Sequence, residues 1–228
     1  METKEIFLNA CNEICKKLDN FKSLQKGQIL KKIAQDKDIF FEIYFQSSFR
    51  NDKSYITIIP HINIYSKQLK KWRAEQTQNE YSSGIIFGGQ LGQLTPFNQW
   101  KEWNVAGMNY EKSVLEISDN IQKYIYSIFD FFEQKEKAID FLTINGTRFN
   151  LWTKNVLTPL DFMIYFADKQ KSETFFNNFI DTCNYKGKII SLYQNLPKET
   201  NIDLNYSEFV FADRVKLAFV NGLKINSR

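Results

Sequence analysis

The chain contains one histidine, His61, and this residue limits the hydrolytic chemistry that the sequence can support. A Ser-His-Asp or Cys-His mechanism would need its imidazole as general base. His61 lies within a run of alternating apolar and polar residues, and no serine or cysteine occupies a recognisable nucleophile turn. We therefore expect a structural cross-strand pair between His61 and Glu42 and assign no catalytic residue. An enzyme that uses carboxylates alone, with Glu42 among them, is a further alternative.

Three cysteines are the next candidates, as metal ligands or as thiols. Cys11 and Cys15 are four residues apart, so both could face one ion from a single helix. Zinc is usually held by four ligands, and only Cys183 and His61 remain as sulfur and imidazole donors. No second ligand pair exists, so we expect buried free thiols, no metal and no cofactor. The odd number of cysteines also argues against a disulfide framework.

A glycine-rich segment, Gly88-Gly89-Gln90-Leu91-Gly92, follows a predicted strand, as a phosphate-binding loop would. It lacks the Lys-Ser/Thr pair of such a loop, and its spacing does not fit G-x-G-x-x-G. A β-bulge or a close approach of two backbones explains it better. Trp100 and Trp103 follow in a predicted loop, where they either plug the edge of the core or stand exposed as binding anchors.

The elements that must position these residues begin with a predicted β-hairpin. Apolar and polar residues alternate over 38–49 and again over 54–65, on either side of the turn-forming segment 50–53. Pairing Arg50 with Lys53 places Glu42 opposite His61 and Gln46 opposite Thr57. One face of the hairpin is then apolar, with Ile39, Phe41, Ile43, Phe45, Ile56, Ile58, Ile62 and Ile64.

The other face of the hairpin carries tyrosines, amides and one acid. Such a face is either solvated or a recognition surface. We take it, together with the glycine and tryptophan segment, as the candidate partner-binding surface. Its residues are Glu42, Tyr44, Gln46, Tyr55, His61, Tyr65, Gly88, Gly89, Gln90, Trp100 and Trp103.

Hydrophobic periodicity predicts helices elsewhere in the chain. The predicted helices cover 3–19, 66–76, 111–133, a segment that starts at Thr158-Pro159-Leu160-Asp161, a segment from Ser172, and 207–221. A third strand is predicted over 82–87. Residues 27–35 fit a strand or a helix, and 134–152 fit either a hairpin turned at Asn145-Gly146 or a helix that ends there.

Length and composition are those of a globular protein. The 228 residues are 43% hydrophobic, 25% charged and 16% aromatic. Strands precede helices without β-α-β alternation, so we predict an α+β fold with an antiparallel sheet and a helical C-terminal third. We expect one domain over 1–228, with a division into 1–110 and 111–228 as the alternative. The first residues lack the apolar core of a signal peptide, and no apolar run approaches the roughly 18 residues that span a bilayer. We therefore expect a cytoplasmic protein without membrane contact.

The formal net charge of +4 is unevenly distributed. Residues 1–75 hold 14 basic and 9 acidic side chains, whereas residues 76–228 hold 16 basic and 17 acidic side chains. Nucleic-acid binding is one interpretation, through Lys67, Lys70, Lys71, Trp72 and Arg73. It is disfavoured because 25 of the 30 basic residues are lysine, whereas bidentate contacts to phosphates and bases favour arginine.

The first half of the chain resembles a bacterial family of unknown function. The resemblance rests on the N-terminal helix, the lysine-bearing segment after it, Phe40-Phe41-Glu42-Ile43-Tyr44-Phe45-Gln46-Ser47-Ser48 and Gly88-Gly89-Gln90-Leu91-Gly92. Members of that family are often small cytoplasmic α+β proteins, and some are similar to immunity proteins encoded beside polymorphic toxins. The helical last third departs from the short members. The resemblance carries no catalytic residue across. The lack of a usable catalytic set, and the aromatic and polar face beside the glycine and tryptophan segment, favour a non-enzymatic immunity or antitoxin-like factor that binds a cognate effector.

Overall fold

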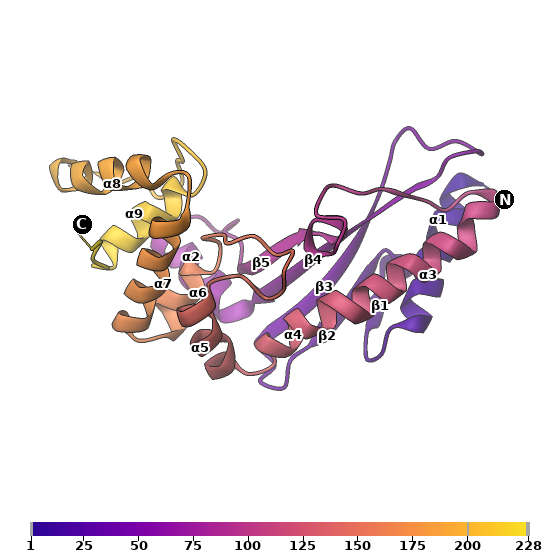
Figure 1. The fold of residues 1–228 in the computed structure, drawn as a ribbon, viewed down its shortest axis with the longest axis horizontal. Coiled ribbons are helices and arrows are strands. Elements are labelled where there is room, and N and C mark those ends of the chain that lie inside the picture. The colour runs from indigo at the N-terminus through magenta and orange to yellow at the C-terminus, as the bar shows by residue number, and fades with distance from the viewer. Residues whose placement is uncertain (1, 200, 227–228) are drawn as a thin grey trace. The chain divides into compact units, whose positions relative to one another are not determined.

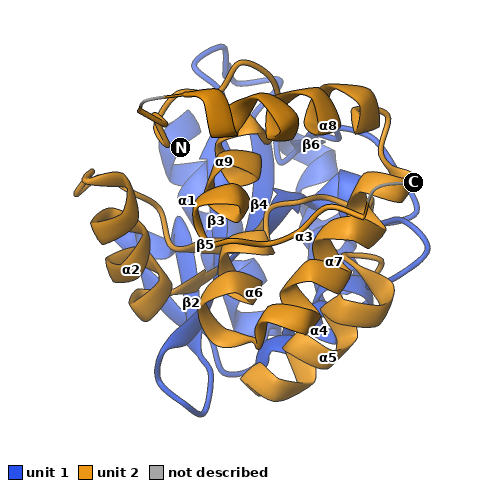
Figure 2. Cartoon of the chain, turned by 90° about the vertical axis from the view of Figure 1, so that its left-hand side faces the viewer, with its two compact units in different colours: residues 1–64, 88–133, 149–153 blue, residues 65–87, 134–148, 154–228 orange. Residues whose placement is uncertain are grey.

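A computed structural model describes residues 2–199 and 201–226. The chain forms two compact units, each assembled from several segments (Figure 2). Unit 1 comprises residues 1–64, 88–133 and 149–153, and unit 2 comprises residues 65–87, 134–148 and 154–228. The sequence-based expectation of one domain, or of a boundary at residue 110, stays a prediction.

The predicted α+β class with an antiparallel sheet is confirmed. The sheet has six strands within the described residues, in the order β1-β2-β3-β4-β5, and β6 pairs with β4. The strands are β1 (Lys22–Leu24), β2 (Ile29–Ile33), β3 (Ile39–Ser47), β4 (Thr57–Ser66), β5 (Ile85–Gln90) and β6 (Trp103–Asn104) (Figure 1). The ambiguous segment 27–35 is therefore a strand, which pairs with β3 so that Lys31 lies opposite Glu42.

Strands β3 and β4 are the predicted hairpin, and its apolar face is the core of the sheet. Ile39, Phe41, Ile43 and Phe45 are fully buried on β3, as are Ile58, Ile62 and Ile64 on β4. The predicted register is wrong, however. Nε2 of His61 lies 2.8 Å from Oε1 of Gln46, whereas the predicted register would hold these residues four positions apart, about 13 Å. The displacement is an even number of residues, so each side chain keeps its predicted face.

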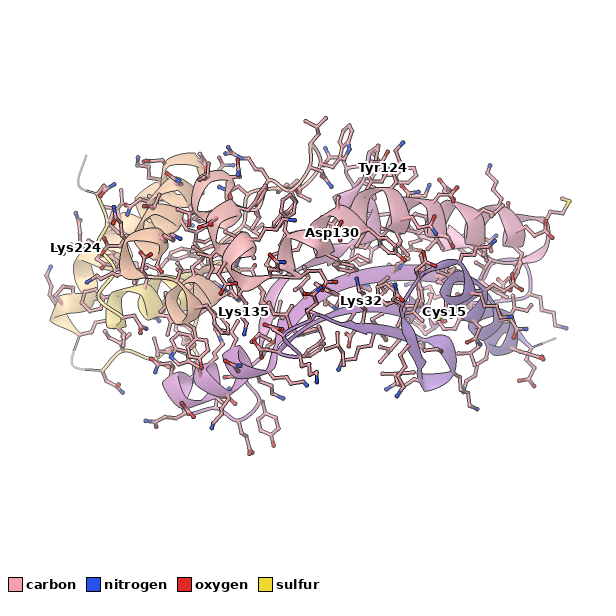
Figure 3. All side chains as sticks on the ribbon, turned by 90° about the horizontal axis from the view of Figure 1, so that it is seen from below. Cys15, Lys32, Tyr124, Asp130, Lys135 and Lys224 are labelled. Carbon is pink, nitrogen blue, oxygen red and sulfur yellow. The ribbon has the colours of Figure 1, made fainter. Side chains whose placement is uncertain are left out.

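The helices of unit 1 cover the apolar face of the sheet. They are α1 (Thr3–Lys17), α3 (Tyr110–Asn120), the π-helical turn η4 (Ile121–Ile125) and α4 (Tyr126–Phe132). The last three run as one continuous rod along the strands in Figure 1, where the sequence predicts a single long helix. Phe129 on α4 stacks on Phe41 with ring centroids 4.5 Å apart. Lys32 on β2, labelled in Figure 3, forms an ion pair of 2.6 Å with Glu133.

Unit 2 is built mainly from helices, as predicted for the last third of the chain. They are α2 (Lys67–Thr77), α5 (Lys135–Asn145), α6 (Leu160–Phe166), α7 (Lys169–Thr182), α8 (Lys186–Asn195) and α9 (Ala212–Val220). Fully buried phenylalanines, among them Phe162 and Phe176, form its core. Short 3-10 turns occur at η1 (Gln25–Gly27), η2 (Leu91–Leu94), η3 (Gly107–Asn109) and η5 (Leu196–Lys198).

Two boundaries in unit 2 resolve or correct the sequence predictions. Helix α5 ends at Asn145-Gly146, so the helical alternative holds and the hairpin does not. Helix α9 begins at Ala212 and not at Ser207, because Phe211 has a φ of 74°, which an α-helix cannot contain. Within the described ranges, no helix combines the length and the apolar character needed to cross a bilayer.

Candidate functional site

Four residues of the predicted surface meet on unit 1 around His61. Tyr44 and Gln46 come from β3, His61 comes from β4, and Trp100 comes from the segment after η2. Gln46 forms the 2.8 Å hydrogen bond with His61. The ring centroids of Tyr44 and Trp100 lie 6.1 and 5.7 Å from that of His61. We call these four residues the Trp100 cluster.

Trp100 is the most exposed aromatic ring of the cluster. Half of its surface, 50%, is accessible to solvent. Its indole Nε1 donates a hydrogen bond of 3.3 Å to Oε1 of Glu102, and its ring stands edge-on to His61 at 63°. These contacts hold the indole in place while leaving much of it free to contact a partner.

His61 is restrained by a hydrogen bond, and its surroundings disfavour the charged form of its imidazole. Burial lowers the pKa of His61 below its ordinary value of 6.5. Because an amide oxygen only accepts, Nε2 of His61 must donate the hydrogen bond to Gln46. The predicted pair with Glu42 is therefore wrong, and the hydrogen-bond partner is an amide that can neither take nor relay a proton. This hydrogen bond orients the ring.

Two residues of the predicted surface are interior supports of unit 1. Gln90 and Trp103 are each only 2% exposed. Nε2 of Gln90 donates to the carbonyl of Lys101 at 2.6 Å, and its Oε1 accepts from the amide of Gly92 at 2.8 Å. Nε1 of Trp103 donates to Glu116 at 3.2 Å. Neither side chain is accessible to a partner in this conformation.

The remaining residues of the predicted surface lie outside the cluster. Tyr55 is exposed just before β4, whereas Glu42 and Tyr65 are partly buried on β3 and β4. Gly88 and Gly89 lie inside β5 and not in a loop. A Cβ atom on Gly88 would come within 2.7 Å of Oδ1 of Asn63 and 3.0 Å of the carbonyl of Ile62. The close approach of the neighbouring strand therefore explains why position 88 is a glycine, and phosphate binding is not needed to explain it.

The cysteines do not form a metal site in the described residues. Cys11 is buried on α1, and burial raises the pKa of its thiol well above the ordinary range. Burial also raises the pKa of Cys15, which lies on the same helix (Figure 3). Within residues 2–199 and 201–226, no group of three or more His, Cys, Asp or Glu side chains is arranged to hold a metal.

Of the residues on α2 that are predicted to bind nucleic acid, some contact other helices of unit 2 and others are exposed. Trp72 stacks on Tyr165 of α6 with ring centroids 5.4 Å apart. Arg73 forms ion pairs with Asp161 and with Asp213, the latter at 2.8 Å. The sequence analysis missed this ion-pair network, because Arg73 and Asp213 are 140 residues apart and neither lies in a recognisable motif. Lys70 and Lys71 remain exposed.

The Trp100 cluster lies in a region of the chain that matches a known family model. Residues 24–131 match the model of a domain of unknown function (DUF4304). This DUF4304 region contains all four residues of the Trp100 cluster and most of the sheet. The predicted resemblance of the first half to a family of unknown function is confirmed in that general form. Neither the curated proteins nor the solved structures contained a match to the chain.

Proposed function

We propose that the protein is a non-enzymatic interaction factor that binds a partner protein through the Trp100 cluster. We further propose that the partner is a bacterial effector, which the protein inhibits as an immunity or antitoxin-like factor. The observation that carries the proposal is the half-exposed indole of Trp100, held edge-on to His61 by fixed neighbours.

The chemistry of the cluster suits a protein partner. Tryptophan and tyrosine are enriched among the residues that dominate binding energy at protein interfaces. Their rings present a large contact area, and a ring already held in place loses little conformational entropy on binding. Gln46 and the indole edge restrain His61, and Tyr44 lies beside it, so the surface is organised before a partner arrives.

The near-zero net charge of unit 1 favours a partner whose contact surface also carries little net charge. Unit 1 contains 13 basic and 14 acidic residues, whereas unit 2 contains 17 basic and 12 acidic residues. The basic excess of the chain therefore belongs to unit 2. Inhibitors of strongly basic nucleases need a complementary acidic field. Unit 1 carries no large net charge of either sign. The proposal therefore specifies an effector whose binding face has no strong net charge.

The test is binding to the product of the gene adjacent to this one. The two purified proteins are titrated by calorimetry, and the effector's toxicity is measured with and without coexpression. Trp100→Ala should weaken binding by a factor of about 30, as expected for an aromatic anchor. Tyr81→Ala is the matched control, because Tyr81 is 87% exposed and lies in unit 2. Equal affinity of Trp100→Ala and the unmodified protein would refute the docking role of the cluster.

Nucleic-acid binding is the second candidate, favoured by the basic excess of unit 2 and by exposed Lys70 and Lys71. Arg73 is already engaged with carboxylates and contributes less than the sequence suggests. A salt titration distinguishes the two functions. Phosphate contacts weaken steeply as salt rises, whereas an aromatic-anchored protein interface responds little.

A further inference from the structure

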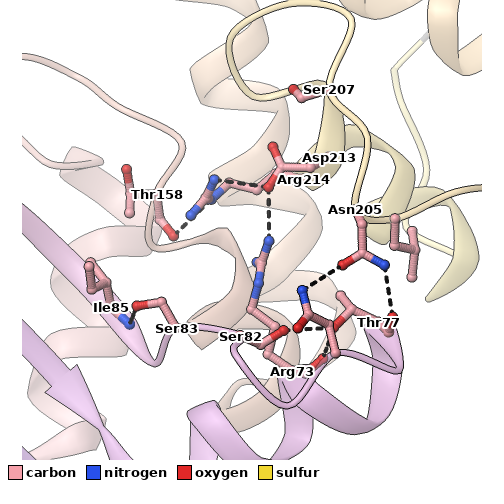
Figure 4. Close-up of a pocket in the computed structure, with 12 residues that line it drawn as sticks. Arg73, Thr77, Ser82, Ser83, Ile85, Thr158, Asn205, Ser207, Asp213 and Arg214 are labelled. Atoms are coloured by element: carbon pink, nitrogen blue, oxygen red, sulfur yellow. Dashed lines mark hydrogen bonds and ion pairs between the residues drawn. The ribbon is translucent and has the colours of Figure 1, made fainter.

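Unit 2 contains a polar cavity of about 440 Å³, which no sequence motif predicts (Figure 4). Its walls come from α2, the segment that leads into β5, residues 204–207 and the start of α9. Ile85 and Leu204 are its aliphatic residues, and the other lining side chains carry hydroxyl, amide, guanidinium or carboxylate groups. Small-molecule sites commonly occupy about 300–1,000 Å³. The cavity therefore has the size of a ligand site, and most of its lining residues carry polar side chains.

Two guanidinium groups share one carboxylate in the wall of this cavity. Nη2 of Arg73 and Nη1 of Arg214 lie 2.8 and 3.2 Å from the same oxygen, Oδ2 of Asp213. Asp161 pairs with Nη1 of Arg73, is 1% exposed and does not line the cavity. Asp161 also lies 3.9 Å from Nε of Arg214, so the two guanidinium groups of the lining are balanced by one carboxylate in the lining and one behind it.

Arg214 retains hydrogen-bonding capacity that the protein does not use. Its Nε donates to the carbonyl of Thr158 at 3.4 Å, and its Nη1 contacts Asp213. Its Nη2 contacts no hydrogen-bond partner among the described residues. Burial lowers the pKa of Arg214, and both burial and the nearby Arg214 lower the pKa of Arg73. An anion in the cavity would offset both effects, because its negative charge favours the charged form of each guanidinium.

We propose that this cavity binds a small polar molecule through a phosphate or carboxylate group that the guanidinium of Arg214 receives. Planar guanidinium donors match the geometry of both acids. Hydroxyl groups of Ser82, Ser83 and Ser207 line the same cavity and are suited to the polar remainder of the ligand. An apolar ligand is disfavoured, because it would leave the unused Nη2 donor of Arg214 without a partner.

Residues 203–206 are fastened to α2 and α9, so this wall of the cavity is in place before a ligand binds. Nδ2 of Asn205 donates to the carbonyl of Thr77 on α2 at 2.9 Å. Lys216, 2% exposed on α9, donates to the carbonyls of Asp203 and Tyr206 at 3.2 and 3.1 Å. These bonds hold residues 203–206 against both helices, and a preorganised site costs less free energy to occupy.

The test uses calorimetric titration of the full chain with inorganic phosphate and, separately, with malonate at low ionic strength. Ser83 provides a matched pair of variants. It is exposed, and its Oγ accepts a hydrogen bond of 3.1 Å from the amide of Ile85. Aspartate and asparagine side chains can both replace that acceptor. Only Ser83→Asp adds a negative charge at the cavity.

We expect Ser83→Asn to bind the probes as the unmodified protein does and Ser83→Asp to bind about tenfold more weakly. Arg214→Lys should weaken binding similarly, and thermal unfolding of each variant without probe reports whether the fold is retained. Stronger binding of phosphate assigns a phosphorylated ligand, and stronger binding of malonate assigns a carboxylate. The proposal is overturned if neither probe binds at millimolar concentration, or if the two Ser83 variants bind equally.

Discussion

The indole of Trp100 stands edge-on to the imidazole of His61, with ring centroids 5.7 Å apart. Trp103, three residues later, is buried and donates its indole hydrogen to Glu116. The sequence offered two interpretations of these tryptophans, as a plug for the core or as exposed anchors. The burial of each ring assigns the first interpretation to Trp103 and makes Trp100 the candidate for the second.

The two tryptophans should therefore differ in their contribution to stability. Trp103→Ala should lower the free energy of unfolding by about 3–5 kcal/mol, because it leaves a cavity and removes the hydrogen bond to Glu116. Trp100→Ala should lower it by about 1 kcal/mol or less, since the ring is half exposed. Urea denaturation followed by circular dichroism measures both. A larger loss for Trp100→Ala than for Trp103→Ala would contradict the assigned roles.

The buried ion pair between Arg73 and Asp161 should be sensitive to the loss of either partner. Asp161→Asn should destabilise the protein by about 3–5 kcal/mol, because it removes the more deeply buried of the two carboxylates that pair with Arg73. Asp140→Asn is the matched control. Asp140 pairs with Lys171 at 2.7 Å, but the two side chains are 63% and 41% exposed. We expect less than about 1 kcal/mol for that surface pair in the same denaturation experiment. Equal effects would show that burial of Asp161 contributes nothing.

The stability of the protein should fall as the pH is lowered through 6.5. Burial lowers the pKa of His61, so the folded state resists protonation while the unfolded chain takes up a proton. The unfolded state then binds more protons, and the free energy of unfolding decreases between about pH 7.5 and 5.5. His61 is the only histidine, so the effect is attributable. Denaturation across this range should show a shallower dependence for His61→Gln. An unchanged pH dependence of the unfolding free energy in His61→Gln would show that other groups cause the loss of stability.

The glycine that ends α5 should not tolerate a side chain. Gly146 has a φ of 59° and a ψ of −141°, and a Cβ atom there would overlap Oδ1 of Asn155. We expect Gly146→Ala to cost about 1–3 kcal/mol. Gly187 in α8 has open space around it, so Gly187→Ala should stabilise by about 0.5–1 kcal/mol. Thermal unfolding of both variants measures the contrast, and effects of the same sign would contradict it.

Local patterns predicted the elements well where one period dominated. The alternation in β3 and β4 identified the buried face, because a half-buried strand needs apolar residues at every second position. Residues 134–152 stayed ambiguous for a physical reason. Asn-Gly suits both a hairpin turn and the end of a helix, and contacts with Asn155 accompany the helical outcome.

The register of the hairpin illustrates what local patterns miss. A tight turn over 50–53 was expected, whereas the structure has a longer connection between Ser47 and Thr57. Oδ1 of Asp52 accepts hydrogen bonds from the amides of Ser54 and Tyr55, and Oδ1 of Asn51 accepts from the amide of Thr57. These side-chain bonds shape the connection, and an even displacement of the strands leaves the apolar pattern unchanged. Periodicity alone therefore cannot distinguish the two registers.

The amino-acid sequence by itself determined the class of the fold and the buried face of the hairpin. These properties follow from short-range periodicity, which each segment carries alone. Only the tertiary structure decided which tryptophan is exposed, which partner holds His61, and that Arg73 meets Asp161 and Asp213 beside a polar cavity. Those relationships join residues far apart in the chain, and the packing that joins them leaves no local pattern to read.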